Sequence, residues 1–544
     1  MTETKKETWR TRWTRLGQFI KRKDGAVAVQ FAILALPLTV LSFGLFDISR
    51  ASIAKQQLQD ALDAANLIAA RSTGVTDTQL NAVGGPALSA NLANLSDATL
   101  STSNFHANGA YIDATATVRV TPVIANLWLQ GDMTISASSQ VVRTMNKVEV
   151  ALVLDNTGSM SYSLGSQTKI VALRSAANQL VDTLATAAAR STDPNAVKIG
   201  VVPFSMTVNV GTTYKNASWM VGTMPTAYGS DIFSNTTTNR FTMLTQTSLS
   251  WAGCVESRPA PYDIQETAPS AGTPATMFVP YFAPDEPDDN TISYTYRGNT
   301  YYYDFGNNWI TNDKTTTTGS TLAALKTRQA RVQKYAASNT GNIASGANGT
   351  GDFGPNRECN MQPIMRMTTD FNSVKARINA MGTGGNTNVP MGLVWGWHLI
   401  SPNGPFADGS AYGTQNLTKV IVLLTDGDNT NDEVSNPQNS IYTGVGYAWQ
   451  ARLLSASNVA LTETSTGTQR RDAMDDREAK LCANIKARGI VIYAIGVGVS
   501  SHSQAILQAC ASGTDKYYNV TDAADLTSTF NAIAGSIQNL RISH

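Results

Sequence analysis

The stretch VEVALVLDNTGSM, residues 148–160, decides the fold of the larger part of the chain. Its first half, as far as Leu154, is apolar apart from Glu149, which is typical of a strand that is buried on both faces. Asp155 ends the run and begins a polar turn that contains Thr157 and Ser159. A buried strand that stops at an acidic, hydroxyl-rich turn predicts a parallel sheet with a ligand site at the carboxyl ends of its strands.

The alternation of buried strands and helices continues to the end of the chain. Apolar runs that predict further strands occupy residues 197–204, 418–425 and 489–499, and a shorter one lies near 517–519. Helical patterns lie between them, at about 168–189, in a charged stretch that ends near Arg488, and at about 522–540. The sequence therefore predicts an α/β fold with a doubly wound, mostly parallel sheet and helices on both faces.

Two long polar stretches interrupt this alternation, at about 207–368 and 429–468. Both are rich in Thr and Asn, the first also in Tyr, Gly and Pro, and connections of this length are uncommon inside a compact domain. We interpret them as insertions into the α/β frame. The acidic residues at 285, 286, 288 and 289 predict a solvated turn within the first insertion.

A second acidic turn follows the strand predicted at 418–425, where Thr425 and Asp426 precede Gly427. The carboxyl ends of neighbouring parallel strands meet at one edge of a sheet, so Asp155 and Asp426 are expected to converge. Two carboxylates with several hydroxyls make a hard, all-oxygen site. Such a site suits Mg²⁺, with Mn²⁺ or Ca²⁺ as alternatives.

The acidic turns resemble the metal-ion-dependent adhesion site of von Willebrand factor A (VWA) domains. Residues 155–159, DNTGS, resemble the DxSxS element, with Thr157 in place of its first serine, and 424–427 resemble the fourth element. The glycine-rich segment 384–388 resembles the loop that supplies the third, with Thr383 as the alternative to its threonine in another register. The resemblance implies a VWA domain over 147–544 and a metal site formed by Asp155, Thr157, Ser159, Thr387 and Asp426.

The N-terminal part of the chain predicts a membrane anchor. Residues 25–46 contain no charged side chain and are long enough to cross about 30 Å of hydrocarbon as a helix. Residues 1–24 are rich in Lys and Arg, and Asp47 follows the apolar run. The positive-inside rule then predicts a single-pass protein of a bacterial inner membrane, with a cytoplasmic N-terminus and the rest exported. A cleaved signal peptide is the alternative.

Residues 47–146 predict a helix followed by a small sheet. An apolar stripe runs along residues 47–71, and this helix is expected to continue the membrane helix outward. The stripe consists of Ala51, Ala54, Leu58, Ala61, Leu62, Ala65, Ile68 and Ala69. Residues 84–146 alternate apolar and polar side chains, which predicts a small sheet packed on the helix.

Residues 23–32, KDGAVAVQFA, and the pattern LQDALDAA at 58–65 resemble TadE/TadG-like proteins of the tight-adherence (Tad, or Flp) pilus system. The stretches around 481–482, 489–496 and 510–511 are similar to the end of the same family. TadG-like proteins combine such an anchor with a C-terminal VWA region. The resemblance implies a role in pilus assembly or adhesion, with a protein partner bound through the metal and contacts with other pilus-assembly proteins.

Four cysteines follow the anchor, an even number in an exported region, which predicts two disulfides. We expect Cys482 to pair with Cys510, tying the helix before a core strand to the segment after it, and Cys254 to pair with Cys359.

The sequence does not predict an enzyme or a nucleic-acid-binding protein. It contains neither a GxSxG, a GxGxxG nor a P-loop, and its 41 basic and 40 acidic residues leave no basic excess. Two other functions remain as alternatives. One is a membrane-anchored VWA scaffold for another envelope complex, and the other is a metal-dependent hydrolase that uses Asp155 and Asp426.

Overall fold

The computed structural model describes residues 23–72, 76–93, 98–108, 111–122, 131–142, 147–189, 191, 193–223, 232–233, 238–288, 292–303, 306–311, 321–347, 353–434 and 438–542. The chain divides into two compact units, Met1–Thr144 and Met145–His544. Most of the basic segment expected at 1–24 lies outside the described residues.

Helix α2 (Lys23–Arg71) in the first unit changes its surroundings along its length. Its N-terminal half exposes large apolar side chains, such as Phe31, which is 74% exposed. It is long and apolar enough to cross a membrane, by length and composition. Its C-terminal half buries Leu58, Leu62 and Ala65. Ile68, predicted on the same stripe, is 46% exposed.

The C-terminal half of α2 packs with α3 (Asp77–Leu92) and an antiparallel sheet. The strand order is β1 (Ala98–Asn108), β2 (Tyr111–Val120) and β3 (Met133–Val142). The prediction of a small sheet is confirmed from residue 98, but residues 84–92 belong to α3. Gly84 is required inside this helix because a Cβ atom there would lie 2.7 Å from the ring of Phe105.

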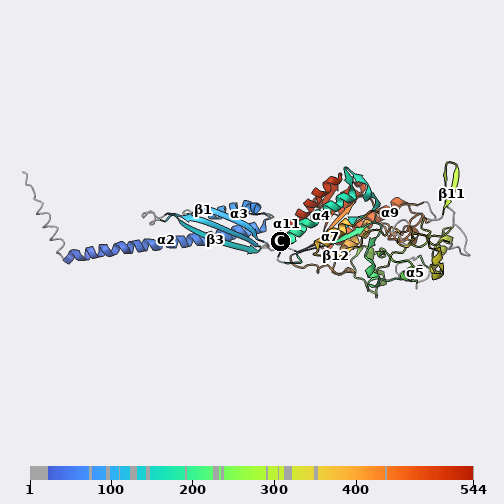
Figure 1. Cartoon of the computed structure of the whole chain (residues 1–544), viewed down its shortest axis with the longest axis horizontal. Coiled ribbons are helices and arrows are strands. Elements are labelled where there is room, and N and C mark those ends of the chain that lie inside the picture. Colours follow the sequence, from blue (N-terminus) through green and yellow to red (C-terminus); the bar gives the residue numbers. More distant parts are fainter. Residues whose placement is uncertain are drawn as a thin grey trace, which may run out of the picture. The chain divides into compact units, whose positions relative to one another are not determined.

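The second unit is built on a mixed sheet with a parallel centre (Figure 1). The strand order is β15 (Tyr517–Val520), β14 (Val491–Val497), β13 (Leu417–Thr425), β4 (Lys147–Asp155), β7 (Val197–Phe204), β8 (Val208–Asn209) and β9 (Cys254–Val255). The strands from β15 to β7 are parallel. Strands β8 and β9 and the short β12 (Met365–Thr368), which pairs with β7, are antiparallel.

Helices cover both faces of this sheet. On one face lie α4 (Lys169–Ala188), α7 (Phe371–Asn379) and α11 (Leu526–Ile542). On the other lie α8 (Val389–Ile400), α9 (Gly467–Ala487) and α10 (Ser501–Cys510). Leu152 of β4 packs in the core on the α4 side and Val153 in the core on the α8 side, which explains why successive residues in the middle of β4 are apolar.

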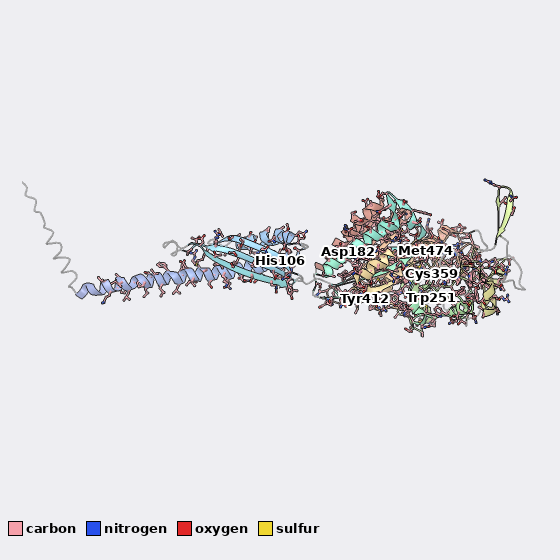
Figure 2. All side chains as sticks on the ribbon, in the orientation of Figure 1. His106, Asp182, Trp251, Cys359, Tyr412 and Met474 are labelled. Carbon is pink, nitrogen blue, oxygen red and sulfur yellow. A yellow bond between two sulfur atoms is a disulfide. The ribbon has the colours of Figure 1, made fainter. Side chains whose placement is uncertain are left out.

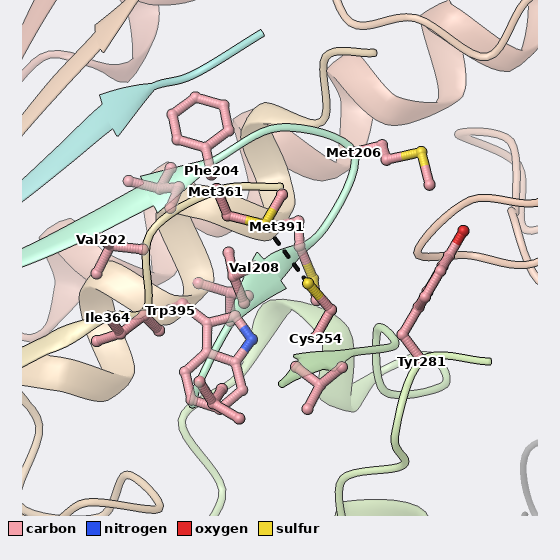
Figure 3. Close-up of a cluster of buried hydrophobic side chains, with 14 of the residues drawn as sticks. Val202, Phe204, Met206, Val208, Cys254, Tyr281, Met361, Ile364, Met391 and Trp395 are labelled. Carbon is pink, nitrogen blue, oxygen red and sulfur yellow. Dashed lines mark hydrogen bonds between the residues drawn. The ribbon is translucent and has the colours of Figure 1, made fainter. Parts of the chain in front are cut away.

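The segment 207–368, expected as an insertion, packs against the α8 side of the sheet. Figure 3 shows Trp395 of α8 near Val208, Cys254 and Met361 in this core. The segment contains α5 (Arg240–Gln246), α6 (Leu322–Gln329) and the hairpin β10 (Ile292–Tyr296)–β11 (Asn299–Tyr303). Its last strand, β12, belongs to the main sheet.

The prediction of a solvated turn was wrong for Asp285 and Glu286, which are 0% and 1% exposed. Buried partners compensate these carboxylates: Lys334 Nζ lies 2.9 Å from Asp285 Oδ2, and Tyr447 donates a 2.6 Å hydrogen bond to Glu286.

The structure contains two disulfides, Cys254–Cys359 and Cys482–Cys510, the same pairs that the sequence predicts. The first lies within the segment 207–368, where Figure 2 labels Cys359. The second joins α9 to the end of α10 on one face of the sheet.

Candidate metal centre

The carboxyl ends of β4 and β13 bring Asp155 and Asp426 together. The two strands are parallel neighbours, and Leu154 of β4 pairs with Leu424 of β13. Asp155 is therefore the last residue of one strand, and Asp426 follows the last residue of the other. Both residues are buried, at 0% and 4% exposure. The convergence expected from the sequence is present in the fold.

Three oxygens at this edge form a compact triangle. Ser159 Oγ lies 2.6 Å from Asp426 Oδ1, and Thr157 Oγ1 lies 3.4 Å from the same atom. The two hydroxyl oxygens are 3.0 Å apart. Adjacent oxygen ligands around an octahedral Mg²⁺ ion lie about 2.9 Å apart. The three separations are therefore close to those between neighbouring ligands of one ion.

The carboxylate of Asp155 is held from both sides. Its Oδ1 accepts a 2.7 Å hydrogen bond from the backbone N–H of Thr157, and its Oδ2 accepts one of 2.7 Å from Thr425 Oγ1. These bonds leave each oxygen further lone pairs. Thr425 was not predicted as part of the site, although its position directly before Asp426 was a usable signal.

The glycine-rich segment 384–388 lies against the turn after β4. Gly158 N–H donates to Gly385 O at 3.0 Å, and Gly384 N–H donates to Asn156 O at 2.8 Å. Gly385 has a φ of +78°, a conformation that favours glycine. The segment is thereby held beside the acidic turn.

The hydroxyl of Thr387, one of the two candidate threonines, lies beside the turn after β13. A Cβ atom built on Gly427 would lie 3.9 Å from Ser159 Oγ and 4.0 Å from Thr387 Oγ1, so both hydroxyls border the turn after β13. The Thr387 backbone N–H donates to Thr430 Oγ1 at 2.8 Å, which fixes its position. Thr430 is a further residue that sequence reasoning missed.

Lys169 is an unpredicted member of the site. Its Nζ lies 2.8 Å from Asp426 Oδ2, and the two side chains are 10% and 0% exposed. Lys169 is the first residue of α4, where the positive end of the helix dipole disfavours a cation. The buried lysine is therefore stabilised by its acidic partner, Asp426, and no local sequence signal points to this pair.

The electrostatics of the centre favour an added positive charge. Burial, together with the charge of nearby Asp426, raises the pKa of Asp155 to about 7. A buried carboxylate in this state needs either a proton or a cation. Carboxylate and hydroxyl oxygens in this spacing fit a hard divalent ion such as Mg²⁺, and the residues that could hold it are Asp155, Thr157, Ser159, Thr387 and Asp426.

The N-terminal segment matches one known protein family. Residues 25–65 match the profile of the TadE-like protein family. No curated protein sequence matches the chain.

Solved structures that align with the chain include proteins of bacterial pili. The PilB minor pilin from Streptococcus sanguinis aligns with 81% of this chain and 78% of its own, at 12% identity and a TM-score of 0.32. The pilus adhesin SpaC from Lactobacillus rhamnosus GG aligns over 81% and 34%, at 11% identity and 0.31. The vWF domain of the type V pili tip protein Mfa5 from Porphyromonas gingivalis aligns over 72% and 95%, at 11% identity and 0.32.

Proposed function

We propose that this chain is a membrane-anchored component of Tad/Flp pilus assembly or adhesion. In this proposal the second unit is a VWA domain whose metal-ion-dependent adhesion site binds a protein partner. The observation that carries the proposal is the convergence of Asp155, Thr157, Ser159 and Asp426 at the carboxyl ends of two neighbouring parallel strands. The family match at residues 25–65 supports the pilus context.

The chain's own residues would prepare the site for a partner carboxylate. Thr425 and the Thr157 N–H fix Asp155, and Lys169 fixes one oxygen of Asp426. When bound, Mg²⁺ would supply a positive charge with coordination positions that the protein does not fill, and an Asp or Glu of the partner would take one of them. Binding, rather than turnover, is the chemistry that this arrangement supports.

An exposed aromatic residue lies next to the site in the sequence. Tyr162 follows the 3₁₀-helix Gly158–Ser161, which carries Ser159, and is 67% exposed. Exposed tyrosines are common anchors in protein interfaces because they bury a large area at low cost in side-chain entropy. Tyr162 is therefore a candidate contact for the same partner.

The exposed apolar half of α2 supports membrane anchoring, with the second unit on the outer side of the inner membrane. Because Cys254–Cys359 and Cys482–Cys510 are disulfides, an oxidising compartment suits that unit. A phosphatase that is active only in the periplasm, fused after residue 146, should be active. An inactive but stably produced fusion would overturn this orientation.

The proposal is tested by partner capture from native membranes. Full-length wild type and Asp155→Ala are each purified in Mg²⁺ and in EDTA, and co-purified pilus proteins are quantified. Capture should occur only for wild type in Mg²⁺. Equal capture in all four conditions would refute a metal-dependent adhesion site.

A further inference from the structure

A second cluster of ligand-type side chains lies between α9 and α10. Asp472 and Asp475 are one turn apart on α9, and His502 lies in the first turn of α10. The ligand atoms of these three residues all lie within 4.8 Å of one another. His502 Nε2 is 2.7 Å from Asp475 Oδ2, and Asp475 is buried while the other two are partly exposed.

A buried carboxylate next to this cluster has an unsatisfied oxygen. Glu478 is 2% exposed, and its Oε1 has no hydrogen-bond partner within the part of the chain that the structure describes. Asn429 Nδ2 donates to both Glu478 Oε2 and Asp475 Oδ1, at 2.9 Å each.

The charges around the cluster are unbalanced. Four carboxylates meet here, those of Asp428, Asp472, Asp475 and Glu478. Among the described residues, the basic side chains in contact with them are His502 and Arg471, whose guanidinium lies 2.9 Å from Asp472, 3.9 Å from Asp475 and 4.0 Å from Asp428. Arg471 is 30% exposed at its side chain and can turn to solvent. Burial raises the pKa of Glu478 to about 8, as expected for a carboxylate without a counter-charge.

We propose that Asp472, Asp475 and His502 bind a second divalent cation, distinct from the one proposed at Asp155 and Asp426. An imidazole nitrogen with two carboxylates suits Zn²⁺ or Mn²⁺, whereas the all-oxygen centre suits Mg²⁺. Ligand atoms that bind one ion at about 2.1 Å lie at most about 4.2 Å apart, so the cluster needs to close by only a few tenths of an ångström. Glu478 lies behind the cluster and is linked to Asp475 through the shared Asn429.

The second cation would stabilise a particular part of the fold. It would join Asp472 and Asp475 of α9 to the start of α10. Farther along both helices, the disulfide Cys482–Cys510 joins them again. Asp475 holds Asn429, and Asn429 Oδ1 in turn accepts the Val389 backbone N–H at 2.8 Å at the start of α8. The cation would therefore fix the loop that follows Asp426.

Zinc binding by the full-length chain in detergent tests this site. Protein stripped with EDTA is dialysed against micromolar Zn²⁺ in excess Mg²⁺, which occupies the all-oxygen centre, and bound zinc is measured by elemental analysis. The test variants are His502→Gln and Asp472→Asn, the second of which changes a side chain that is 56% exposed and should fold normally. Co²⁺ absorption spectra report whether nitrogen and oxygen ligands surround the ion.

Two controls separate this site from others. His106→Gln removes a similar but isolated pair, His106–Asp77 on the first unit (Figure 2), and Asp155→Asn disables the all-oxygen centre. Wild type and both controls should bind about one Zn²⁺ per chain, and the two test variants should bind it at least about tenfold more weakly. Equal zinc binding by wild type and Asp472→Asn would overturn the proposal, and so would loss of zinc binding in a control variant alone. Neither result depends on whether the adhesion site binds a partner.

Discussion

Lys169 Nζ lies 2.8 Å from Asp426 Oδ2, and both side chains are almost completely buried at the candidate metal centre. The ammonium group therefore already neutralises one of the two carboxylates there. Within the part of the chain that the structure describes, no basic side chain pairs with Asp155, whose oxygens accept hydrogen bonds from Thr157 N–H and Thr425 Oγ1. The centre is partly charge-compensated before any cation binds, and this affects both its stability and its affinity for metal.

Replacing Lys169 with Met should destabilise the metal-free protein and strengthen cation binding. Removing one partner of a buried ion pair costs about 3–5 kcal/mol because the other charge is left uncompensated. The same uncompensated charge should raise Mg²⁺ affinity about tenfold. Thermal unfolding in EDTA and in Mg²⁺ measures both effects. Lys375→Met, which breaks the exposed pair with Asp182, is the control and should change little. Weaker Mg²⁺ binding by Lys169→Met would contradict this account.

The metal-free protein should lose stability as the pH rises. The pKa of Asp155 is raised from 3.8 to about 7 in the folded state, mainly by burial, so between these values the folded state holds a proton that the unfolded state has lost. The free energy of unfolding should therefore fall between about pH 4 and 7, by up to about 4 kcal/mol. Glu478, raised to about 8, acts in the same direction over pH 4.5–8. Denaturant unfolding in EDTA should show a smaller loss for Asp155→Asn. An unchanged pH profile in that variant would be inconsistent with the assignment.

Tyr162→Ala should weaken partner capture without weakening metal binding. The side chain is 67% exposed and no site residue depends on it, so its loss should remove interface area only. Capture in Mg²⁺ should fall by about tenfold or more if Tyr162 is a central contact. Tyr111→Ala, on the first unit and 39% exposed, is the matched control. Equal capture by both variants would remove Tyr162 from the interface.

The two disulfides should differ in their contribution to stability. Cys254–Cys359 spans a sequence separation of 105 residues and Cys482–Cys510 one of 28. On the chain-entropy model the first contributes about 4.8 kcal/mol and the second about 3.6 kcal/mol. Denaturant unfolding of the two double-alanine variants should rank them in this order. The reverse order would indicate that native contacts of the smaller loop outweigh chain entropy.

The sequence predicted the parallel centre of the sheet because its strands are buried on both faces. A short, mostly apolar run such as residues 150–154 of β4 is too short for a buried helix and fits a strand that is covered on both sides. The turn at its end contains Asp155, Thr157 and Ser159, whose oxygen atoms can be recognised as possible metal ligands from the sequence. The small sheet of the first unit was predicted to begin too early, because the alternation of apolar and polar residues was taken to start at residue 84, whereas the first strand begins at Ala98. Residues 84–92 instead belong to α3, in which Gly84 lies against the ring of Phe105.

The residues that were missed depend on contacts between distant parts of the chain. Lys169 meets Asp426 only because α4 begins under the ends of β4 and β13. Asp285 and Glu286 looked solvated because their buried partners, Lys334 and Tyr447, come from separate segments. Asp475 and His502 are likewise joined only by the packing of α9 on α10. No local pattern carries these pairings.

Electron paramagnetic resonance of bound Mn²⁺ can determine whether Asp155 and Asp426 form a divalent-cation site. The measurement uses full-length protein carrying His502→Gln, which removes the second proposed site, and compares it with and without Asp155→Asn. We expect about one bound Mn²⁺ per chain, displaced by excess Mg²⁺, and no bound Mn²⁺ once Asp155→Asn is added. Mn²⁺ binding that is absent from both proteins, or unchanged by Asp155→Asn, would contradict this expectation.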